Sequence, residues 1–355
     1  MSRRPNKILI LYTEIAGYTI TCINKTIELY SNIEFHIVRW PVNKEAPFQF
    51  ELNSASIYER NDFTNEQLLE LANTINPDLI ISSGWMDKGY VNVCKHYKGK
   101  VKTVLALDNH WLGSTRQKIA ALLSSFIVKN KFSHVWVPGK PQRQFAKKLG
   151  YKSSEISEGF YSADVDLFSS YFEKAKESKM SNFPKRFIYV GRYVKHKGIF
   201  DMWNAFIELQ KEQPNDWELW CIGTGDEFDN KIEHGKIKHF GFVQPENFLE
   251  YIEKTGVYIL PSYVEPWGVS LHEFAAAGFP LVCSDKIGAS EKFIKKGKNG
   301  YVFPAGDIEA IKDAFRKVID LSENELLDMQ KKSIELSLLI TPKKWANTLM
   351  KLLND

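Results

Sequence analysis

Short apolar runs alternate with segments of helical periodicity along nearly the whole of this 355-residue chain. The runs are four to six residues long, which suits strands buried on both faces of a sheet, with crossover helices between them. The expected strands are Lys7–Tyr12, Glu34–Val38, Asp78–Ser82, Val101–Ala106, His134–Val137, Phe187–Val190, Trp217–Ile222, Lys238–Phe242, Val257–Leu260 and Leu281–Ser284. This alternation predicts an α/β fold built on parallel sheets.

Capping residues indicate where several helices begin. Thr64 precedes the expected helix Asn65–Ile75, and Gln67 completes a capping box with it. Asp307 is placed to cap Ile308–Ile319 in the same way. The other expected helices are Thr19–Tyr30, Ile199–Lys211, Phe248–Lys254, Asn324–Ser337 and Trp345–Leu353, the last with its start near Pro342.

A polar break divides the pattern into two halves. Gly159–Asn182 carries no strand signal, and the alternation restarts after it. Because 355 residues exceed the usual size of one compact core, we expect two doubly wound α/β domains in tandem, joined near 160–185. We set these domains at 1–165 and 166–341. The irregular, aromatic-rich stretch 41–63 is left unassigned.

The charge is unevenly distributed along the chain. Residues 1–165 carry 21 Lys and Arg against 15 Asp and Glu, and the remainder carries 26 against 28, which gives a net charge of +4. The basic excess concentrates in Lys88–Lys102 and Arg116–Lys152. One interpretation is an ordinary solvated surface; the other is a patch that faces anionic lipid or an acidic acceptor. Nucleic acid is disfavoured, because no base-stacking or groove-reading motif accompanies the charge.

The rest of the composition favours a cytoplasmic protein. No apolar run approaches the roughly 18 to 20 residues that span a bilayer. The first apolar run is too short for the core of a secretion signal. Four cysteines lie far apart without metal-binding or redox spacing, and we expect them to be reduced. A peripheral position at the inner face of a membrane is an open alternative through the basic patch.

Two glutamates bracket an expected strand-to-helix junction in the second half. Glu265 lies in the loop after Val257–Leu260, and Glu273 lies eight positions later, in the first turns of a short apolar helix that ends at Gly278. The free N–H groups at such a helix start form an anion site. A phosphate could bind there, with the carboxylates nearby to accept hydrogen bonds from sugar hydroxyls.

A basic, glycine-flanked loop follows the strand Phe187–Val190. It runs from Gly191 through Arg192 and Lys197 to Gly198, so that backbone N–H groups and two cations could meet a diphosphate. Taken alone, such a loop is more often a solvent-exposed basic turn.

Another glycine loop, Gly223-Thr224-Gly225, follows the strand Trp217–Ile222. It does not complete G-x-G-x-x-G, and neither does the loop after the first strand. A dinucleotide-dependent oxidoreductase is therefore disfavoured.

Taken in chain order, these motifs resemble the retaining glycosyltransferases of the GT-B fold, specifically their large family four, the glycosyl transferases group 1. The matching pieces are Val190-Gly191-Arg192, Lys197-Gly198, Gly223-Thr224-Gly225, Phe240-Gly241-Phe242-Val243, Leu260-Pro261-Ser262, Glu265 with Glu273, Ala277-Gly278-Phe279-Pro280-Leu281-Val282 and Gly300-Tyr301-Val302-Phe303. The resemblance covers residues 186–320, and the first half matches in pattern only. It implies two Rossmann-like domains facing across a cleft, acceptor on the first and donor on the second, with the helix 342–355 packed back on the first.

The resemblance also implies a role for each matching residue. Arg192 and Lys197 would bind the donor diphosphate, Glu273 would bind the ribose hydroxyls, and Glu265 would contact the transferred sugar. Glu265, Arg192 and Lys197 are therefore expected catalytic residues. Phe242 and Val243 would lie near the base. The other donor-binding residues would be Gly191, Gly223 and the backbone of Trp267, Gly268, Val269 and Ser270.

Polar residues also follow the strand Val101–Ala106 of the first domain. The resemblance implies that His110 contacts the donor sugar as a catalytic residue, with Asp108, Asn109 and Gly17 on the acceptor side. The alternative is a helix-capping Asp or Asn beside a half-buried histidine.

The activity that the resemblance implies is that of a retaining, metal-independent hexosyltransferase with no cofactor besides its co-substrate, a nucleoside-diphosphate sugar. The sugar would pass to a hydroxyl of a glycan, lipid-linked or polysaccharide acceptor. Asp164 and Asp166 look like a metal-binding pair, but they lie at the expected linker and no metal is assigned. The alternatives are a non-catalytic nucleotide-sugar-binding subunit and a sugar-nucleotide epimerase of the same fold.

Overall fold

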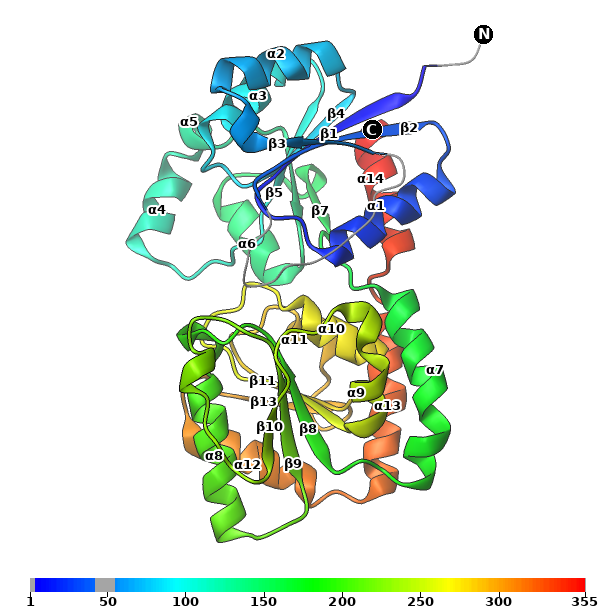
Figure 1. Ribbon diagram of the computed structural model, residues 1–355. Coiled ribbons are helices and arrows are strands. Elements are labelled where there is room, and N and C mark those ends of the chain that lie inside the picture. The colour runs from blue at the N-terminus through cyan, green and yellow to red at the C-terminus, as the bar shows by residue number, and fades with distance from the viewer. Residues whose placement is uncertain (1–3, 42–54, 355) are drawn as a thin grey trace. The chain divides into compact units, whose positions relative to one another are not determined.

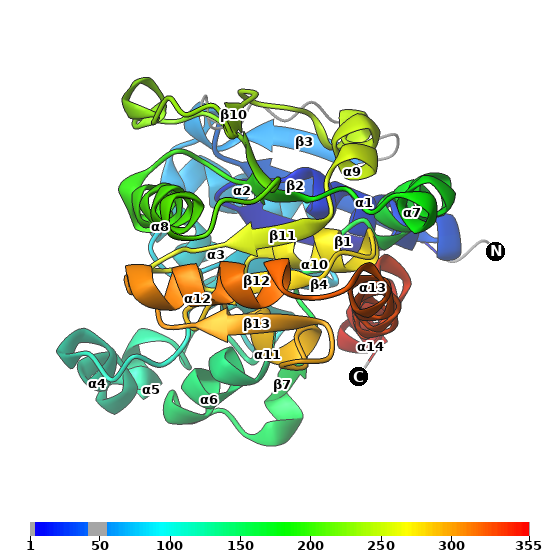
Figure 2. The ribbon, with the colours of Figure 1, turned by 90° about the horizontal axis from the view of Figure 1, so that it is seen from below.

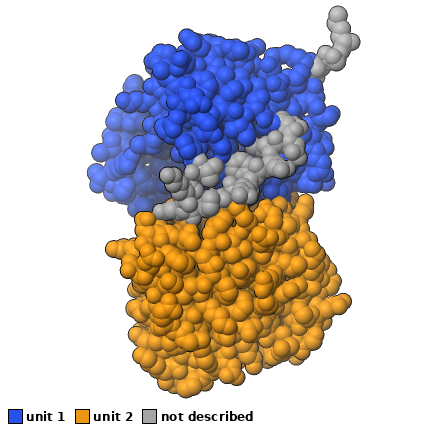
Figure 3. All heavy atoms as spheres, viewed as in Figure 1, with its two compact units in different colours: residues 1–43, 47–162, 342–355 blue, residues 44–46, 163–341 orange. Residues whose placement is uncertain are grey.

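The computed structural model describes residues 4–41 and 55–354, which form two compact units (Figure 3). Of the described residues, unit 1 holds those up to Ser162 together with the terminal segment from Pro342, and unit 2 runs from Ala163 to Thr341. Each unit is a parallel sheet with helices packed against it (Figure 1). The predicted α/β fold class is confirmed.

Within the described residues, seven parallel strands form the sheet of unit 1, in the order β3-β2-β1-β4-β5-β6-β7. They are β1 (Asn6–Tyr12), β2 (Ile33–Arg39), β3 (Ala55–Glu59), β4 (Leu79–Ser83), β5 (Lys102–Ala106), β6 (His134–Val137) and β7 (Ile156–Glu158). The helices of this unit are α1 (Gly17–Leu29), α2 (Asn65–Ile75), α3 (Lys88–Tyr97), α4 (Thr115–Leu122), α5 (Ser124–Ile127), α6 (Lys140–Lys148) and α14 (Pro342–Asn354). The capping box of Thr64 and Gln67 at α2 is confirmed.

Alternate residues of β1 supply the two cores of unit 1. Leu9 and Leu11 pack into one core with residues of α2, α3 and α6, whereas Ile8 and Ile10 pack into the other with residues of α1 and α14. Trp345 of α14 is 3% exposed. Its indole N–H donates to the carbonyl oxygen of Phe160 at 2.8 Å, and α14 is therefore part of the core of unit 1.

The sheet of unit 2 contains six parallel strands among the described residues, in the order β10-β9-β8-β11-β12-β13. They are β8 (Arg186–Val190), β9 (Glu218–Ile222), β10 (Ile237–His239), β11 (Val257–Leu260), β12 (Leu281–Ser284) and β13 (Gly300–Phe303). Its helices are α7 (Val165–Ser181), α8 (Ile199–Glu212), α9 (Leu249–Lys254), α10 (Val269–Ala276), α11 (Ser290–Phe293), α12 (Ile308–Ile319) and α13 (Glu323–Ser337). Asp307 caps α12 as predicted.

The two units join between Ser162 and Ala163, inside the expected stretch 160–185. Most of that stretch is not a linker, however, but the helix α7. Asp164 caps this helix by accepting a hydrogen bond from the N–H of Leu167 at 3.0 Å. Phe168 and Tyr171 are buried, and these few anchors hold a helix whose other residues are largely polar.

Two other strand expectations differ from the structure. The strand expected at Lys238–Phe242 is β10, which ends at His239, shortly before Gly241 adopts a φ of 70°. The unassigned stretch 41–63 contains β3, a half-exposed strand that pairs with β2 at the edge of its sheet. Residues 42–54 of that stretch lie outside the described part.

None of the helices described is both long enough and apolar enough to cross a bilayer. The four cysteines, Cys22, Cys94, Cys221 and Cys283, are buried and unpaired with one another.

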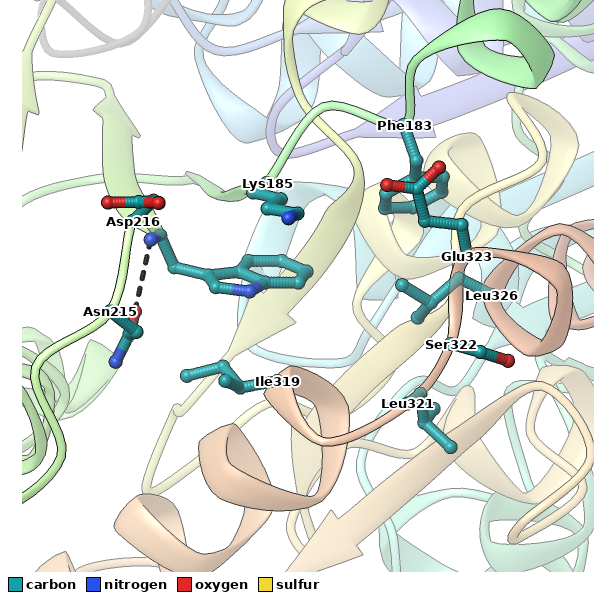
Figure 4. Close-up of a pocket in the computed structure, with 10 residues that line it drawn as sticks. Phe183, Lys185, Asn215, Asp216, Ile319, Leu321, Ser322, Glu323 and Leu326 are labelled. Atoms are coloured by element: carbon teal, nitrogen blue, oxygen red, sulfur yellow. Dashed lines mark hydrogen bonds between the residues drawn. The ribbon is translucent and has the colours of Figure 1, made fainter.

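The strand order of each sheet reverses at one point. In unit 1 the chain turns back between β1 and β4, and in unit 2 between β8 and β11. Open α/β sheets bind their ligands beyond the carboxyl ends of the strands at such a switch point. A pocket of about 340 Å³ in unit 2 lies elsewhere, because it is lined by Lys185 and Trp217, which directly precede β8 and β9 (Figure 4).

The substitution Trp345→Ala should destabilise unit 1 by about 3–5 kcal/mol, the usual cost of truncating a buried aromatic side chain. The indole packs on Trp136, with 4.9 Å between the ring centroids, and its hydrogen bond to Phe160 is also lost. Urea unfolding measures the change. Lys351→Ala, at an exposed position of the same helix, should change the unfolding free energy by less than about 0.5 kcal/mol.

Candidate functional site

The loops that follow β8 and β11 meet at the switch point of unit 2. The ammonium group of Lys197, from the first loop, pairs with the carboxylate of Glu265, from the second. Their side chains are 15% and 17% exposed, respectively. A backbone hydrogen bond of 2.8 Å from the N–H of Tyr263 to the carbonyl of His196 joins the same two loops. One predicted cation and one predicted acid are therefore in direct contact.

Two glycines allow the loops to approach so closely. Gly198 has a φ of 67°, and a Cβ at this position would clash with the carbonyl oxygen of Pro261. Gly223, after β9, has a φ of 140°, and a Cβ there would clash with the carbonyl oxygen of Gly191. Positive φ and contact with another backbone both require glycine. The loops after β8, β9 and β11 thus converge at one edge of the sheet.

Helix α10 begins in the same loop as Glu265. Gly268, with a φ of 91°, is its N-cap residue and provides no side-chain cap, while Val269 and Ser270 form its first turn. The hydroxyl of Ser270 accepts a hydrogen bond of 2.7 Å from Tyr258. The first N–H groups of a helix have no partner within it, and the helix dipole makes this end positive. The positive end therefore lies beside the Lys197–Glu265 pair in sequence and in space.

The side chain of Trp267 is 2% exposed and packs edge-on against Phe293, with 6.1 Å between ring centroids. A ligand contact from Trp267 would therefore have to come from its backbone, and this role stays a prediction. Its carbonyl already accepts a hydrogen bond of 2.9 Å from the N–H of Ala289.

Glu273 lies on α10, one turn beyond Ser270. Burial raises the pKa of its carboxyl from an ordinary value of 4.5 to about 8, and the nearby charge of Asp164 adds to this effect. Most Glu273 carboxyls are therefore protonated at neutral pH when no ligand is bound. Hydroxyl groups that donate hydrogen bonds to the carboxylate would favour its charged form and lower this pKa.

His272, which the sequence analysis missed, holds α10 in place. Its Nδ1 accepts a hydrogen bond of 3.1 Å from the N–H of Ala163, so the proton is on Nε2, which donates to the carbonyl of Ser337 at 2.8 Å. The ring is fully buried and stacks on Phe293, with 4.0 Å between centroids. Burial lowers the pKa of His272 to about 4, so the ring stays neutral. The sequence signal that could have identified this buried role is the position of the histidine on the apolar side of a short helix.

The remaining donor-side residues lie in loops at the same edge of the sheet. Arg192 follows Gly191 and is half-buried, and its carbonyl accepts a hydrogen bond of 2.9 Å from Tyr189. Phe242 and Val243 are half-buried in the loop after β10. The structure therefore brings the predicted donor-side residues to one edge of one sheet, and their roles stay predictions.

The acceptor-side residues and His110 form a separate group in unit 1. Gly17 is the first residue of α1, just after β1, and Asp108, Asn109 and His110 lie in the loop after β5. Both loops leave the carboxyl edge of the seven-stranded sheet. Tyr161 donates a hydrogen bond of 3.4 Å to Asp108.

The capping alternative for Asp108 and Asn109 is wrong for the helix that follows, because Ser114 caps α4. His110 is half-buried, and its carbonyl accepts a hydrogen bond of 2.7 Å from the side chain of Gln117. The same side chain accepts a hydrogen bond of 2.7 Å from the N–H of Leu112, so Gln117 holds the shape of the loop.

Residues 170–335 match the family described as glycosyl transferases group 1. The chain is 31% identical over 144 residues to a glycogen synthase of Mycobacterium tuberculosis, covering 39% of this chain and 34% of that protein. It is 30% identical over 190 residues to a phosphatidyl-myo-inositol mannosyltransferase of Mycobacterium leprae, covering 50% of this chain and 46% of that protein. The chain thus spans less than half the length of these relatives.

The structure is also similar to that of Anabaena HepE in complex with UDP and glucose, with a TM-score of 0.72 over 98% of this chain and 99% of that one. Only 13% of the residues are identical, so the likeness concerns the fold. Two Rossmann-like α/β domains of the GT-B type, which the resemblance in sequence implied, are confirmed.

The raised pKa of Glu273 predicts how stability depends on pH. The folded protein holds this proton up to about pH 8, whereas the unfolded chain releases it near 4.5, so stability is lost as pH rises through this window. Glu273→Gln removes the effect. The variant should therefore gain about 1–3 kcal/mol of unfolding free energy relative to the parent protein between about pH 5 and pH 8.

Urea unfolding without ligand, at both ends of that pH window, measures this gain. Glu246→Gln, at an exposed position of the same unit, serves as the control and should follow the parent protein. Parallel stability curves for the parent and Glu273→Gln would contradict the proton assignment.

Proposed function

We propose that this chain, whose residues 170–335 match the family of glycosyl transferases group 1, moves a sugar from a nucleoside-diphosphate sugar to a hydroxyl of an acceptor. The observation that carries the proposal is the Lys197–Glu265 pair at the switch point, beside the start of α10. A cation, a helix N-terminus and a carboxylate are thereby gathered where ligands of open α/β sheets bind.

We assign the donor diphosphate to Lys197, Arg192 and the first N–H groups of α10. Negative charge develops on the diphosphate as the glycosidic bond to it breaks, and fixed cations and dipoles stabilise that charge. With these groups to stabilise the charge on the diphosphate, we propose that the reaction is metal-independent and uses no further cofactor.

The two acids have different roles in this proposal. Glu265 exchanges its contact with Lys197 for hydroxyls of the transferred sugar when the diphosphate arrives. Glu273 accepts hydrogen bonds from the ribose and, since its pKa of about 8 must fall on binding, releases a proton. Donor affinity should therefore increase as pH rises toward 8.

The acceptor is assigned to unit 1, where Gly17, Asp108, Asn109 and His110 lie at the carboxyl edge of the sheet. We propose a retaining reaction. The acceptor oxygen forms the new bond to the anomeric carbon on the face that the diphosphate leaves, and a diphosphate oxygen takes the acceptor proton. Glycan, polysaccharide and lipid-linked acceptors are the classes to test, since similar proteins include a glycogen synthase and a phosphatidyl-myo-inositol mannosyltransferase.

A panel of UDP-, GDP- and ADP-sugars should identify the donor by thermal shift, since a ligand that binds only the folded state raises its melting temperature. UDP-glucose is the first to test, because the similar HepE structure holds UDP and glucose. Donor hydrolysis by the purified protein distinguishes an enzyme from a binding subunit, and product transfer onto an acceptor distinguishes a transferase from an epimerase. A protein that binds donor but neither hydrolyses nor transfers it would be a binding subunit.

Lys197→Ala and Glu273→Ala should each weaken donor binding at least about tenfold and lower turnover at least about 100-fold. Lys195→Ala is the matched control, because Lys195 lies two positions from Lys197 and its side chain is 83% exposed. Isothermal titration calorimetry and initial rates measure both effects. Near-parent activity in both variants would refute the site assignment.

Glu265→Gln should separate the two kinds of contact. Free nucleoside diphosphate, which has no sugar, should bind this variant as well as or better than the parent protein, because Lys197 is released from its carboxylate partner. Turnover should nevertheless fall at least about 100-fold, because a neutral amide accepts hydrogen bonds from the sugar hydroxyls more weakly than the carboxylate. A weaker affinity for the free diphosphate would contradict the proposed exchange of partners.

A further inference from the structure

Unit 1 exposes a row of large apolar side chains on α4, α5 and the loop before them. Leu112, Ile119, Leu122, Leu123 and Phe126 are 68%, 52%, 82%, 42% and 75% exposed, respectively. Helix α4 itself contains no buried residue. Isolated exposed apolar residues are normal, but five within 15 residues are a concentration of the kind found where a protein contacts a partner. We call these five residues the α4–α5 patch.

The main members of the patch share one side of the helical path. Leu123 N–H donates to the carbonyl of Ile119 at 2.9 Å, and Ile127 N–H donates to that of Leu123 at 3.0 Å, so helical spacing continues across the joint. Ile119, Leu122 and Phe126, three and four positions apart, therefore lie on the same side. In both ribbon views α4 lies at the periphery of unit 1, away from the sheet (Figures 1 and 2).

Basic side chains border the α4–α5 patch. Residues 109–154 contain nine Lys and Arg but no Asp or Glu. Arg116 and Lys118 are exposed on α4 itself. Lys148 of α6 reaches back to Trp111, with 5.9 Å from its ammonium to the ring centroid. The guanidinium of Arg116 also lies 3.7 Å from the sulfur of Met86, which is 74% exposed and extends the apolar surface.

We propose that the α4–α5 patch docks this chain on an anionic lipid bilayer, with its apolar side chains inserted at the interface. Helices that lie in the interface combine large apolar residues with Lys and Arg, whose long side chains reach the headgroups. A second copy of the chain fits less well. A twofold contact through this patch would bring Arg116 and Lys118 of both copies together, and residues 109–154 contain no acid to offset them.

This proposal uses none of the donor-side residues, so it can fail while the proposed function stands. It also assigns a binding partner, anionic lipid, to the basic stretch 109–154. A bilayer surface is also where a lipid-linked acceptor would be presented.

Flotation with vesicles tests the proposal on the full chain. The protein should float with vesicles of equal parts phosphatidylcholine and phosphatidylglycerol, much less with phosphatidylcholine alone, and less at high salt. The double variant Leu122→Ser with Phe126→Ser should partition at least about tenfold less, since it loses two inserting side chains. Met180→Ser, at a 68%-exposed position on α7 of unit 2, should float like the parent protein.

Insertion, as opposed to adsorption by charge alone, has its own measurement. Since the four native cysteines are buried, a Phe126→Cys variant can be labelled there with a thiol-reactive, polarity-sensitive dye. Its emission should shift to shorter wavelength with the anionic vesicles and stay unchanged with the neutral ones.

No flotation with anionic vesicles, or flotation that the apolar double variant retains in full, overturns the proposal. A dimer in solution that the same variant dissociates also overturns it, because the patch then belongs to a second copy. In each case the donor-induced thermal shift of the parent protein reports separately on the proposed function. The same shift in the double variant shows that it is folded.

Discussion

The ion pair between Lys197 and Glu265 joins the loops that follow β8 and β11, where the strand order of unit 2 reverses. Both groups are largely removed from water, so each would lose much of its stabilisation if its partner were absent. A ligand that brings an anion to the lysine and hydroxyls to the carboxylate replaces this contact without leaving either charge unpaired. The pair thus offers a positive group to a diphosphate and a negative group to the hydroxyls of a sugar.

The geometry around this pair depends on the backbone as much as on side chains. Gly198 and Gly223 let three loops converge, and Gly268 begins the helix whose positive end lies beside the pair. Burial then sets the protonation states of the two neighbouring groups on α10: His272 stays neutral, and Glu273 keeps its proton at neutral pH. Under the proposed function, the charge of this region would change mainly at Glu273, and donor binding would then be linked to proton release.

The sequence predicted those features that depend on local pattern. Val257–Leu260 and Leu281–Ser284 are strands with the expected bounds, because each is a continuous apolar run between breakers. Helix α7 was mistaken for a linker because its apolar anchors are sparse among charged residues. Lys197 and Glu265 were both recognised, but their contact was not, since a pairing across 68 positions leaves no local signal. The link of His272 to Ala163 spans 109 positions and was missed for the same reason.

The hydrogen bonds of His272 bear on whether unit 2 can be excised from the chain or inserted into another protein. One imidazole binds the first residue of that unit, Ala163, and Ser337, four positions before its last residue. The ends of the unit are therefore neighbours in space. A domain with adjoining ends can be excised as a single fragment, or grafted into a surface loop of a host, without stretching either polypeptide. The two ends of unit 2 thus have the geometry that such transfers need, and one neutral side chain, His272, holds them together.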